Sequence, residues 1–297
     1  MKACFAISLL ADVHTSKLIF RISDQFSEFT CTRTVFLAAA LMGRFKMKQK
    51  SSHVATNMPE VTSHTSSSGS DNDLAPVASS SFESRVSSGL RLLGATCLHV
   101  ASKLEDVSFL GVRDLLALMA ESDSWRPYTV ADMLKMEEAL LTVVDFHLHV
   151  PTVIDFLHIY FDSIPCLQGA ETVHCMSKYL GEVTLLFPSL FGERHASSLI
   201  ATALMYYTMT YFKIEWQIGL LVRTSEYSSS CVSACVRSVA DAHKAMDSRH
   251  IDSSTFRRYD VSKFYNISQL PCMATQDLLF LQKKLCGDLA CRGVRPI

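Results

Sequence analysis

The sequence predicts an all-α protein that is divided into two domains. Apolar residues recur at helical spacing from about Phe82 onward, and short turn signals such as Ser122-Asp123-Ser124 and Phe187-Pro188-Ser189 separate the helical segments. A chain of 297 residues suits two domains of the commonest size. The chain is 48% hydrophobic and only 19% charged, against about 25% charged in typical soluble domains, so we expect large apolar surfaces buried in cores or at an interface.

A capping pattern marks the clearest predicted helix, which covers residues 130–144. Thr129 with Asp132 three residues later makes a start like a capping box, because the threonine oxygen accepts orphan backbone N–H groups. One face of this helix is apolar and consists of Met133, Met136, Leu140, Leu141 and Val144. Pro151-Thr152 follows, and proline disfavours helical geometry in the preceding residue but suits the first turn of a new helix. We therefore expect the domain boundary at Pro151.

A weak internal repeat also favours two units. Residues 93–98, LGATCL, and residues 199–204, LIATAL, have a similar pattern of small and apolar side chains. Small side chains let neighbouring helices approach closely, so each segment suits the buried central helix of a bundle. Two unrelated alanine-rich core helices remain an alternative explanation.

Residues 51–81 break the apolar pattern, because they are rich in Ser, Thr, Asn, Asp and Pro. A segment of this composition cannot bury enough apolar surface to offset the entropy of ordering. We predict a disordered loop there.

Composition argues against nucleic acid, metal and membrane as partners. The net charge of −1 supplies no basic field for a phosphate backbone. The ten cysteines are scattered from Cys4 to Cys291 without a CxxC pair, so we expect separate thiols, no metal and no cofactor. No uninterrupted apolar run reaches the about 18 residues that a bilayer span requires. Residues 1–11 could pass for a short signal-peptide core, but no clear cleavage pattern follows, so we do not expect secretion.

Two separated motifs in the first half resemble the signatures of cyclin boxes. Residues 92–107, LLGATCLHVASKLEDV, resemble the signature helix, in which a small-residue helix ends in Ala-Ser-Lys and an acidic pair. Residues 136–152, MEEALLTVVDFHLHVPT, resemble the second motif and follow at the family's usual distance. Upstream, residues 34–45 resemble the family's second helix, where Arg33 and Gly43 replace two acidic residues.

The second half resembles the C-terminal fold of A/B-type mitotic cyclins. Residues 178–186, KYLGEVTLL, are similar to its start, and residues 258–268 are similar to its closing segment. The resemblance implies two tandem five-helix cyclin folds over residues 12–150 and 151–270, with a C-terminal extension over residues 271–297.

The resemblance implies a regulatory subunit that binds and activates a cyclin-dependent serine/threonine protein kinase. It also implies control of cell-cycle progression at G2/M and a location in the nucleus and cytoplasm. In cyclins, the residues that match Lys103 and Glu137 meet on the kinase-contacting face and hydrogen-bond the kinase backbone. The other kinase-binding residues that the resemblance implies are Leu104, Glu105, Asp106, Leu141, Phe146 and Leu148. A solvated ion pair for Lys103 and Glu137, and core packing for Phe146 and Leu148, remain alternatives.

Substrate docking is not assigned. Asp12 and Leu18 stand where mitotic cyclins carry the Arg and Trp that bind Arg-x-Leu substrate peptides. Kinase substrates stay candidate partners, but this departure puts the docking patch in doubt.

Other functions compete with the kinase regulator. A divergent cyclin-like scaffold would bind a partner without activating a kinase, and a cyclin-fold transcription factor would be expected to show a basic face or a zinc ribbon. The sequence contains no Gly-rich phosphate loop, no His-Arg-Asp loop and no clustered acid–base set, so we do not expect an enzyme.

Overall fold

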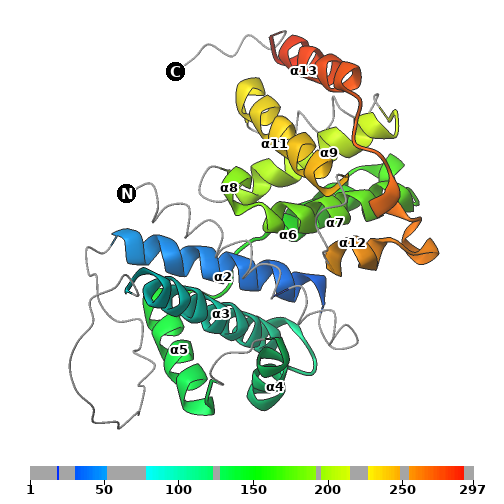
Figure 1. Cartoon of the computed structure of the whole chain (residues 1–297). Coiled ribbons are helices and arrows are strands. Elements are labelled where there is room, and N and C mark those ends of the chain that lie inside the picture. The colour runs from blue at the N-terminus through cyan, green and yellow to red at the C-terminus, as the bar shows by residue number, and fades with distance from the viewer. Residues whose placement is uncertain are drawn as a thin grey trace, which may run out of the picture. The chain divides into compact units, whose positions relative to one another are not determined.

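The computed structural model is described for most of the chain. The described residues are 19, 31–51, 78–122, 128–191, 195–214, 227–247 and 254–290. The regular elements in these ranges are α-helices and 3-10 helices, with no β-strand among them, which confirms the predicted all-α class (Figure 1). Residue contacts divide the chain into two compact units, 1–150 and 151–297.

The first unit is arranged around one long helix. Its described helices are α2 (Thr32–Ser51), α3 (Ala78–Glu105), α4 (Val112–Ser122) and α5 (Val130–Val143). Helix α3 contacts all the others, with α2 on one side and α4 and α5 on the other (Figure 1). Residues 92–102 of α3 are all buried, because the small residues of this stretch let helices pack closely on several sides.

Helix α5 begins where its sequence predicts. The Thr129 hydroxyl accepts a hydrogen bond from the Asp132 N–H at 3.2 Å, and the Asp132 carboxylate accepts one from the Thr129 N–H at 2.9 Å. This reciprocal pair is the expected capping box. Of the predicted apolar face, Leu141 is only half-buried, and the others lie in the core.

The second unit is arranged around helix α9 (Ser197–Tyr211), which is buried without interruption over residues 199–210. Helices α6 (Val153–Ser163), α7 (Glu171–Leu186) and α11 (Ser229–Asp247) pack against it. The other described elements of this unit are η1 (Pro165–Leu167), α8 (Pro188–Phe191), α12 (Ser254–Tyr259), η3 (Ser262–Phe264), η4 (Ile267–Gln269) and α13 (Thr275–Ala290). The two small-residue segments of the sequence repeat therefore both lie in buried helices.

Helix α6 differs in detail from its prediction. Thr152 is the N-cap, and its N–H donates to the Asp155 carboxylate at 2.8 Å. Pro151 precedes this cap, so it lies outside the first helical turn in which we expected it.

One predicted segment changes its bounds. Ser51 and residues 78–81, assigned to the disordered loop, are helical, and residues 52–77 lie outside the described residues. In the predicted C-terminal extension, α13 packs on α11 and α9 and buries Leu281 and Leu285. Residues 12–30, which would hold the predicted first helix of the first domain, are undescribed except for Ile19.

The search for membrane spans found no described helix that is both long and apolar enough to cross a bilayer. Nor do three His, Cys, Asp or Glu side chains gather as a metal site would require, within the ranges given above.

Candidate functional site

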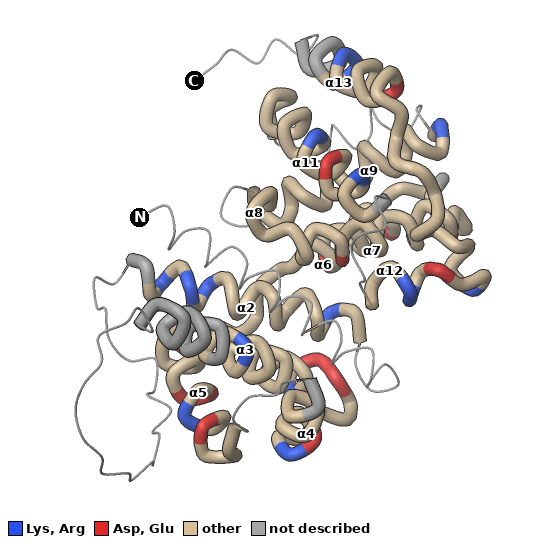
Figure 2. Tube along the Cα trace, viewed as in Figure 1, with Lys and Arg blue, Asp and Glu red and all other residues tan. Residues whose placement is uncertain are grey.

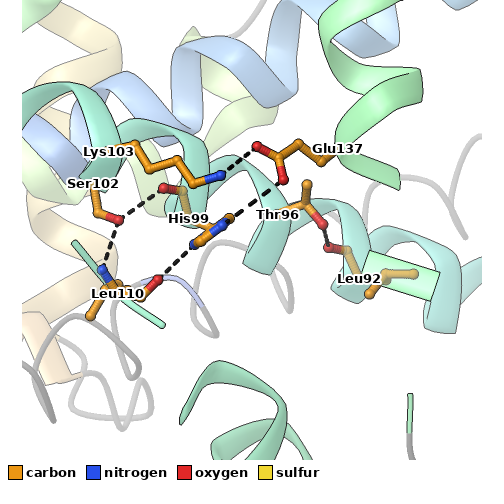
Figure 3. Close-up of polar contacts among 7 residues, drawn as sticks. All are labelled: Leu92, Thr96, His99, Ser102, Lys103, Leu110 and Glu137. Atoms are coloured by element: carbon orange, nitrogen blue, oxygen red, sulfur yellow. Dashed lines mark hydrogen bonds and ion pairs between the residues drawn. The ribbon is translucent and has the colours of Figure 1, made fainter. Parts of the chain in front are cut away.

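The end of α3 and the middle of α5 form an ion pair at the surface of the first unit. The Lys103 Nζ atom donates to the Glu137 Oε1 atom at 2.7 Å (Figure 3). The Lys103 side chain is 39% exposed, whereas that of Glu137 is 15% exposed. Lysine also suits this place because it lies in the last turn of α3, where the helix dipole favours a cation. The pair therefore combines an anchored carboxylate with a cation that solvent or a partner can reach.

A buried histidine lies beneath this pair. The His99 Nδ1 atom is 2.6 Å from the Leu110 carbonyl oxygen, which can only accept, so Nδ1 carries the proton (Figure 3). The Nε2 atom lies 4.0 Å from the second oxygen of Glu137. Burial lowers the pKa of His99, and this outweighs the opposing effects of the Leu110 hydrogen bond and Glu137. The imidazole is therefore neutral at neutral pH.

The turn after α3, residues 106–111, is tied to that helix through both backbone groups of Leu110. The Ser102 hydroxyl accepts from the Leu110 N–H at 3.0 Å and donates to the His99 carbonyl at 2.9 Å. Together with the His99 contact, this satisfies the N–H and the carbonyl of one buried turn residue (Figure 3).

Exposed apolar residues follow the ion pair along the chain. Leu104 is partly exposed, Val107 is fully exposed and Phe109 is 59% exposed. Only Leu104 was assigned to the site from the sequence. Val107 and Phe109 were missed, although two large apolar residues in a turn that directly follows Glu105 and Asp106 are a detectable signal.

The acidic pair Glu105 and Asp106 faces the start of α2. Glu105 pairs with Arg33 at 3.5 Å, and one Asp106 oxygen accepts from the Cys31 N–H at 2.9 Å and the Thr34 hydroxyl at 2.7 Å. In Figure 2 the acidic turn lies next to the beginning of α2. Asp106 thus satisfies a backbone donor at a helix N-terminus, so these two carboxylates are engaged apart from Lys103 and Glu137.

The turn after α5 carries the last of the expected site residues. Asp145 and Phe146 both have a left-handed backbone, with φ of 56° and 54°, and the Phe146 ring is 70% exposed. Leu141 and Leu148 are half-buried. Arg44 of α2 donates to the His147 carbonyl and so holds the turn from the other side. Core packing therefore does not explain Phe146, and Leu148 combines packing with partial exposure.

Comparison with protein families gives two matches. Residues 79–149 match the cyclin N-terminal domain, and residues 151–273 match the cyclin C-terminal domain. The first match covers α3 to α5, and the second runs from α6 through η4. Both cyclin domains are therefore present.

Curated relatives are similar to this chain at modest identity. Cyclin-A1 of Homo sapiens is 30% identical over 181 residues, which cover 60% of this chain and 36% of the relative. Cyclin-A2 of Xenopus laevis is 26% identical over 60% of this chain and 41% of the relative. The G2/mitotic-specific cyclin-A of Hydra viridissima is 25% identical over 61% of this chain and 41% of the relative. The chain thus spans less than half the length of the curated relatives that it matches.

Proposed function

Because the chain belongs to the cyclin family, we propose that it is the regulatory, non-catalytic subunit of a cyclin-dependent serine/threonine protein kinase. The observation that carries the proposal is the Lys103–Glu137 pair, set beside exposed apolar residues at the end of α3. A partner's backbone can hydrogen-bond the partly exposed Lys103 and the more buried Glu137. Its apolar side chains can pack on the exposed apolar residues beside this pair, which we call the apolar rim.

Binding would use the two kinds of contact in different ways. The Lys103 ammonium has three N–H donors, and the Glu137 carboxylate accepts, so the pair can hydrogen-bond exposed backbone groups of the kinase. Burying Leu104, Val107 and Phe109 would add the hydrophobic contribution, at about 25 cal/mol per Å² of apolar surface removed from water. The charged pair then gives register and specificity, while the apolar rim contributes most of the affinity.

Activation follows from selective binding to one kinase conformation. A kinase needs its β3 lysine paired with a C-helix glutamate and an ordered activation segment before it transfers phosphate. A subunit that binds this arrangement better than the inactive one shifts the population toward it by its differential affinity. No catalytic group of this chain is required.

We further propose an A/B-type role at G2/M, in the nucleus and cytoplasm. The similarity of the chain to A-type cyclins supports this stage, because the Hydra relative is a G2/mitotic-specific cyclin-A. Kinase substrates are proposed as further partners. No docking patch for them is assigned, because Asp12 and Leu18 lie outside the described residues.

A second candidate function is a cyclin-like scaffold that binds a partner without activating a kinase. It is favoured by the acidic turn, since Glu105 and Asp106, which the resemblance implies to be kinase-binding residues, are held by α2 and would have to leave it to reach a kinase.

One experiment separates the two candidates. The tagged chain is purified from dividing cells, the co-purifying kinase is identified, and phosphorylation of a generic substrate is measured with the kinase alone and with the complex. We expect a stoichiometric cyclin-dependent kinase and a rise in activity of at least about a hundredfold. Binding without a rise in activity would favour the scaffold, and recovery of no kinase would overturn the assignment as a kinase regulator.

A further inference from the structure

His99 is the one described residue of the buried stretch 92–102 with a titratable ring, and its neighbours there are mostly apolar or small. A polar group in such a place is costly unless it is hydrogen-bonded. Thr96 bonds within α3 itself, because its hydroxyl donates to the Leu92 carbonyl, whereas the Ser102 hydroxyl bonds both the His99 carbonyl and the Leu110 N–H beyond the helix. The imidazole of His99 makes its contacts outside the helix.

The His99 ring contacts groups on two other elements. Its Nδ1 atom donates to the Leu110 carbonyl, and its Nε2 atom faces Glu137 on α5. The His99 ring also makes a T-shaped contact with the Phe109 ring, with centroids 6.2 Å apart and planes at 68°. The ring therefore lies between the 106–111 turn and the ion pair.

We propose that His99 is a positioning residue that locks the 106–111 turn to the Lys103–Glu137 pair, so that the pair and the exposed Phe109 ring meet the kinase as one preformed surface. This inference rests on the proposed function. It assigns to Phe109 a role as an apolar anchor, and to His99 the role of holding that anchor in register with the charged pair.

Preformation matters because a mobile turn would have to be ordered during binding. Ordering rotamer-rich side chains and backbone on association costs affinity, and this cost disappears where the turn is already fixed. Leu110 is the fixed point, since its side chain is buried and its N–H and carbonyl bond Ser102 and His99. Phe109 is its neighbour and is the exposed residue that the fixed point orients.

A histidine that merely fills the core would behave differently under substitution. The amide nitrogen of His99→Asn can take the place of Nδ1 and keep the bond to Leu110. His99→Gln places its amide nearer the Nε2 position and loses that bond. His99→Leu keeps apolar volume alone and leaves the Leu110 carbonyl without its partner. Core filling predicts that Leu is tolerated best, whereas positioning predicts that Asn is.

The first measurement does not involve the kinase. Hydrogen exchange of residues 106–111 is followed in the free full-length chain. We expect His99→Gln and His99→Leu to speed exchange of the Leu110 amide at least about tenfold, and His99→Asn to change it less than threefold. Ser102→Ala, which removes the other tie to Leu110, should speed it as well and remains informative if a His99 variant fails to fold. Equal exchange in all variants overturns the positioning role.

The second measurement is a double-mutant cycle on affinity for the kinase recovered with the wild-type chain. Phe109→Ala should weaken binding about tenfold in the wild type but less than threefold in the His99→Leu background. Phe146→Ala is the matched control, since the described ring, ion-pair and hydrogen-bond contacts of the His99 side chain are with Phe109, Glu137 and Leu110, and its effect should be equal in both backgrounds. Equal effects of Phe109→Ala in both backgrounds overturn the coupling. Failure of the wild type to bind any kinase overturns the proposed function instead, while the exchange result still decides whether His99 fixes the turn.

Discussion

Each unit contains a glutamate paired with a basic residue, but the two pairs differ in how far they are buried and in how many hydrogen bonds the glutamate accepts. In the second unit, Glu182 on α7 is 1% exposed and accepts two contacts from Arg258 at 3.1 and 3.2 Å and one from the Tyr259 hydroxyl at 3.0 Å. In the first unit, Glu137 is 15% exposed and pairs with Lys103, whose side chain is 39% exposed against 21% for Arg258.

The comparison indicates different uses for similar chemistry. A carboxylate that is buried and accepts three hydrogen bonds from Arg258 and Tyr259 connects α7 to α12 and is not accessible to a partner. A carboxylate with a hydrated cation beside it can be desolvated later, when a partner arrives. We therefore expect Glu182 to contribute to stability, and the binding role of Glu137 stays a prediction.

The largest effect is expected at Glu182. Glu182→Ala leaves the half-buried Arg258 guanidinium and the Tyr259 hydroxyl without their acceptor, and breaking such a buried pair typically costs about 3–5 kcal/mol. Urea unfolding followed by circular dichroism measures the loss. Glu138→Ala, an exposed residue of α5, is the control and should change stability by less than about 0.5 kcal/mol. A loss below about 1 kcal/mol for Glu182→Ala would contradict the structural role.

Binding should respond at Lys103 and Glu137 where stability does not. Lys103→Ala and Glu137→Ala should each weaken kinase binding by about 2 kcal/mol, or roughly 30-fold, because a charge left unpaired in an interface is costly. The same changes should alter unfolding by less than about 1 kcal/mol, since the free pair is partly hydrated. Titration of the labelled kinase gives the affinities.

The matched control for these variants is Lys135→Ala, an exposed lysine of α5, which should bind like the wild type. If the Lys103 and Glu137 variants bind within about threefold of wild type, the pair is only a solvated surface contact. If both variants unfold, the pair is structural and the assignment to the interface fails.

A smaller effect should appear on acidification, through His174 of α7. Burial lowers the pKa of His174 to about 4, and the neighbouring Lys178 and His158 act in the same direction. The unfolded chain therefore takes up this proton first, so stability falls as the pH drops from about 6.5 to about 4 and does not fall further from this cause below pH 4. Because the ring is only half-buried, we expect a loss of about 1 kcal/mol.

The urea midpoint at pH 7.5 and pH 4.5 tests this prediction. His174→Phe should reduce the difference between the two midpoints, because it packs on Phe161 without a titrating group. If His174→Phe shows the same difference between the two midpoints as the wild type, groups other than His174 cause the loss of stability. The same pair of urea midpoints for His99→Asn tests a histidine of the first unit, because burial also lowers the pKa of His99.

The smallest effect is expected from deleting residues 52–77 and joining α2 to α3 through a short Gly-Ser linker instead. Closure entropy changes only slowly with loop length, so we expect the free energy of unfolding and kinase affinity to change by less than about 0.5 kcal/mol. The deletion stops at Val77 because α3 begins at Ala78. Loss of folded protein on this deletion would show that the segment contributes packing.

Some of these features followed directly from residue patterns. The capping box at Thr129 and Asp132 needs only two residues at fixed spacing, and the burial of residues 199–204 follows from small and apolar side chains in series. The all-α class rests on many such local signals. The kinase-binding role of Lys103 and Glu137 stays a prediction.

Other features depend on contacts between separate segments of the chain, which local sequence patterns do not predict. Nothing in the residue type of Asp106 says that its carboxylate turns back to cap α2, because that requires the path of the chain after α3. The role of His99 was missed because its partners lie on the following turn and on α5. The start of α3 at Ala78 was missed because serine-rich composition favours disorder.

The contact between Thr34 and Asp106 also bears on the order of folding, because these residues are 72 positions apart. Helices α3, α4 and α5 are joined by short connections, so they can associate early at little entropic cost. The N-terminus of helix α2 is capped by Asp106 only after the turn that follows α3 has formed. The long connection between α2 and α3 must also close before the two groups can meet. We therefore expect α2 to dock late in folding. Shortening the connection to α3 should accelerate that step more than it changes the equilibrium, since the loop must close before the contact stabilises anything.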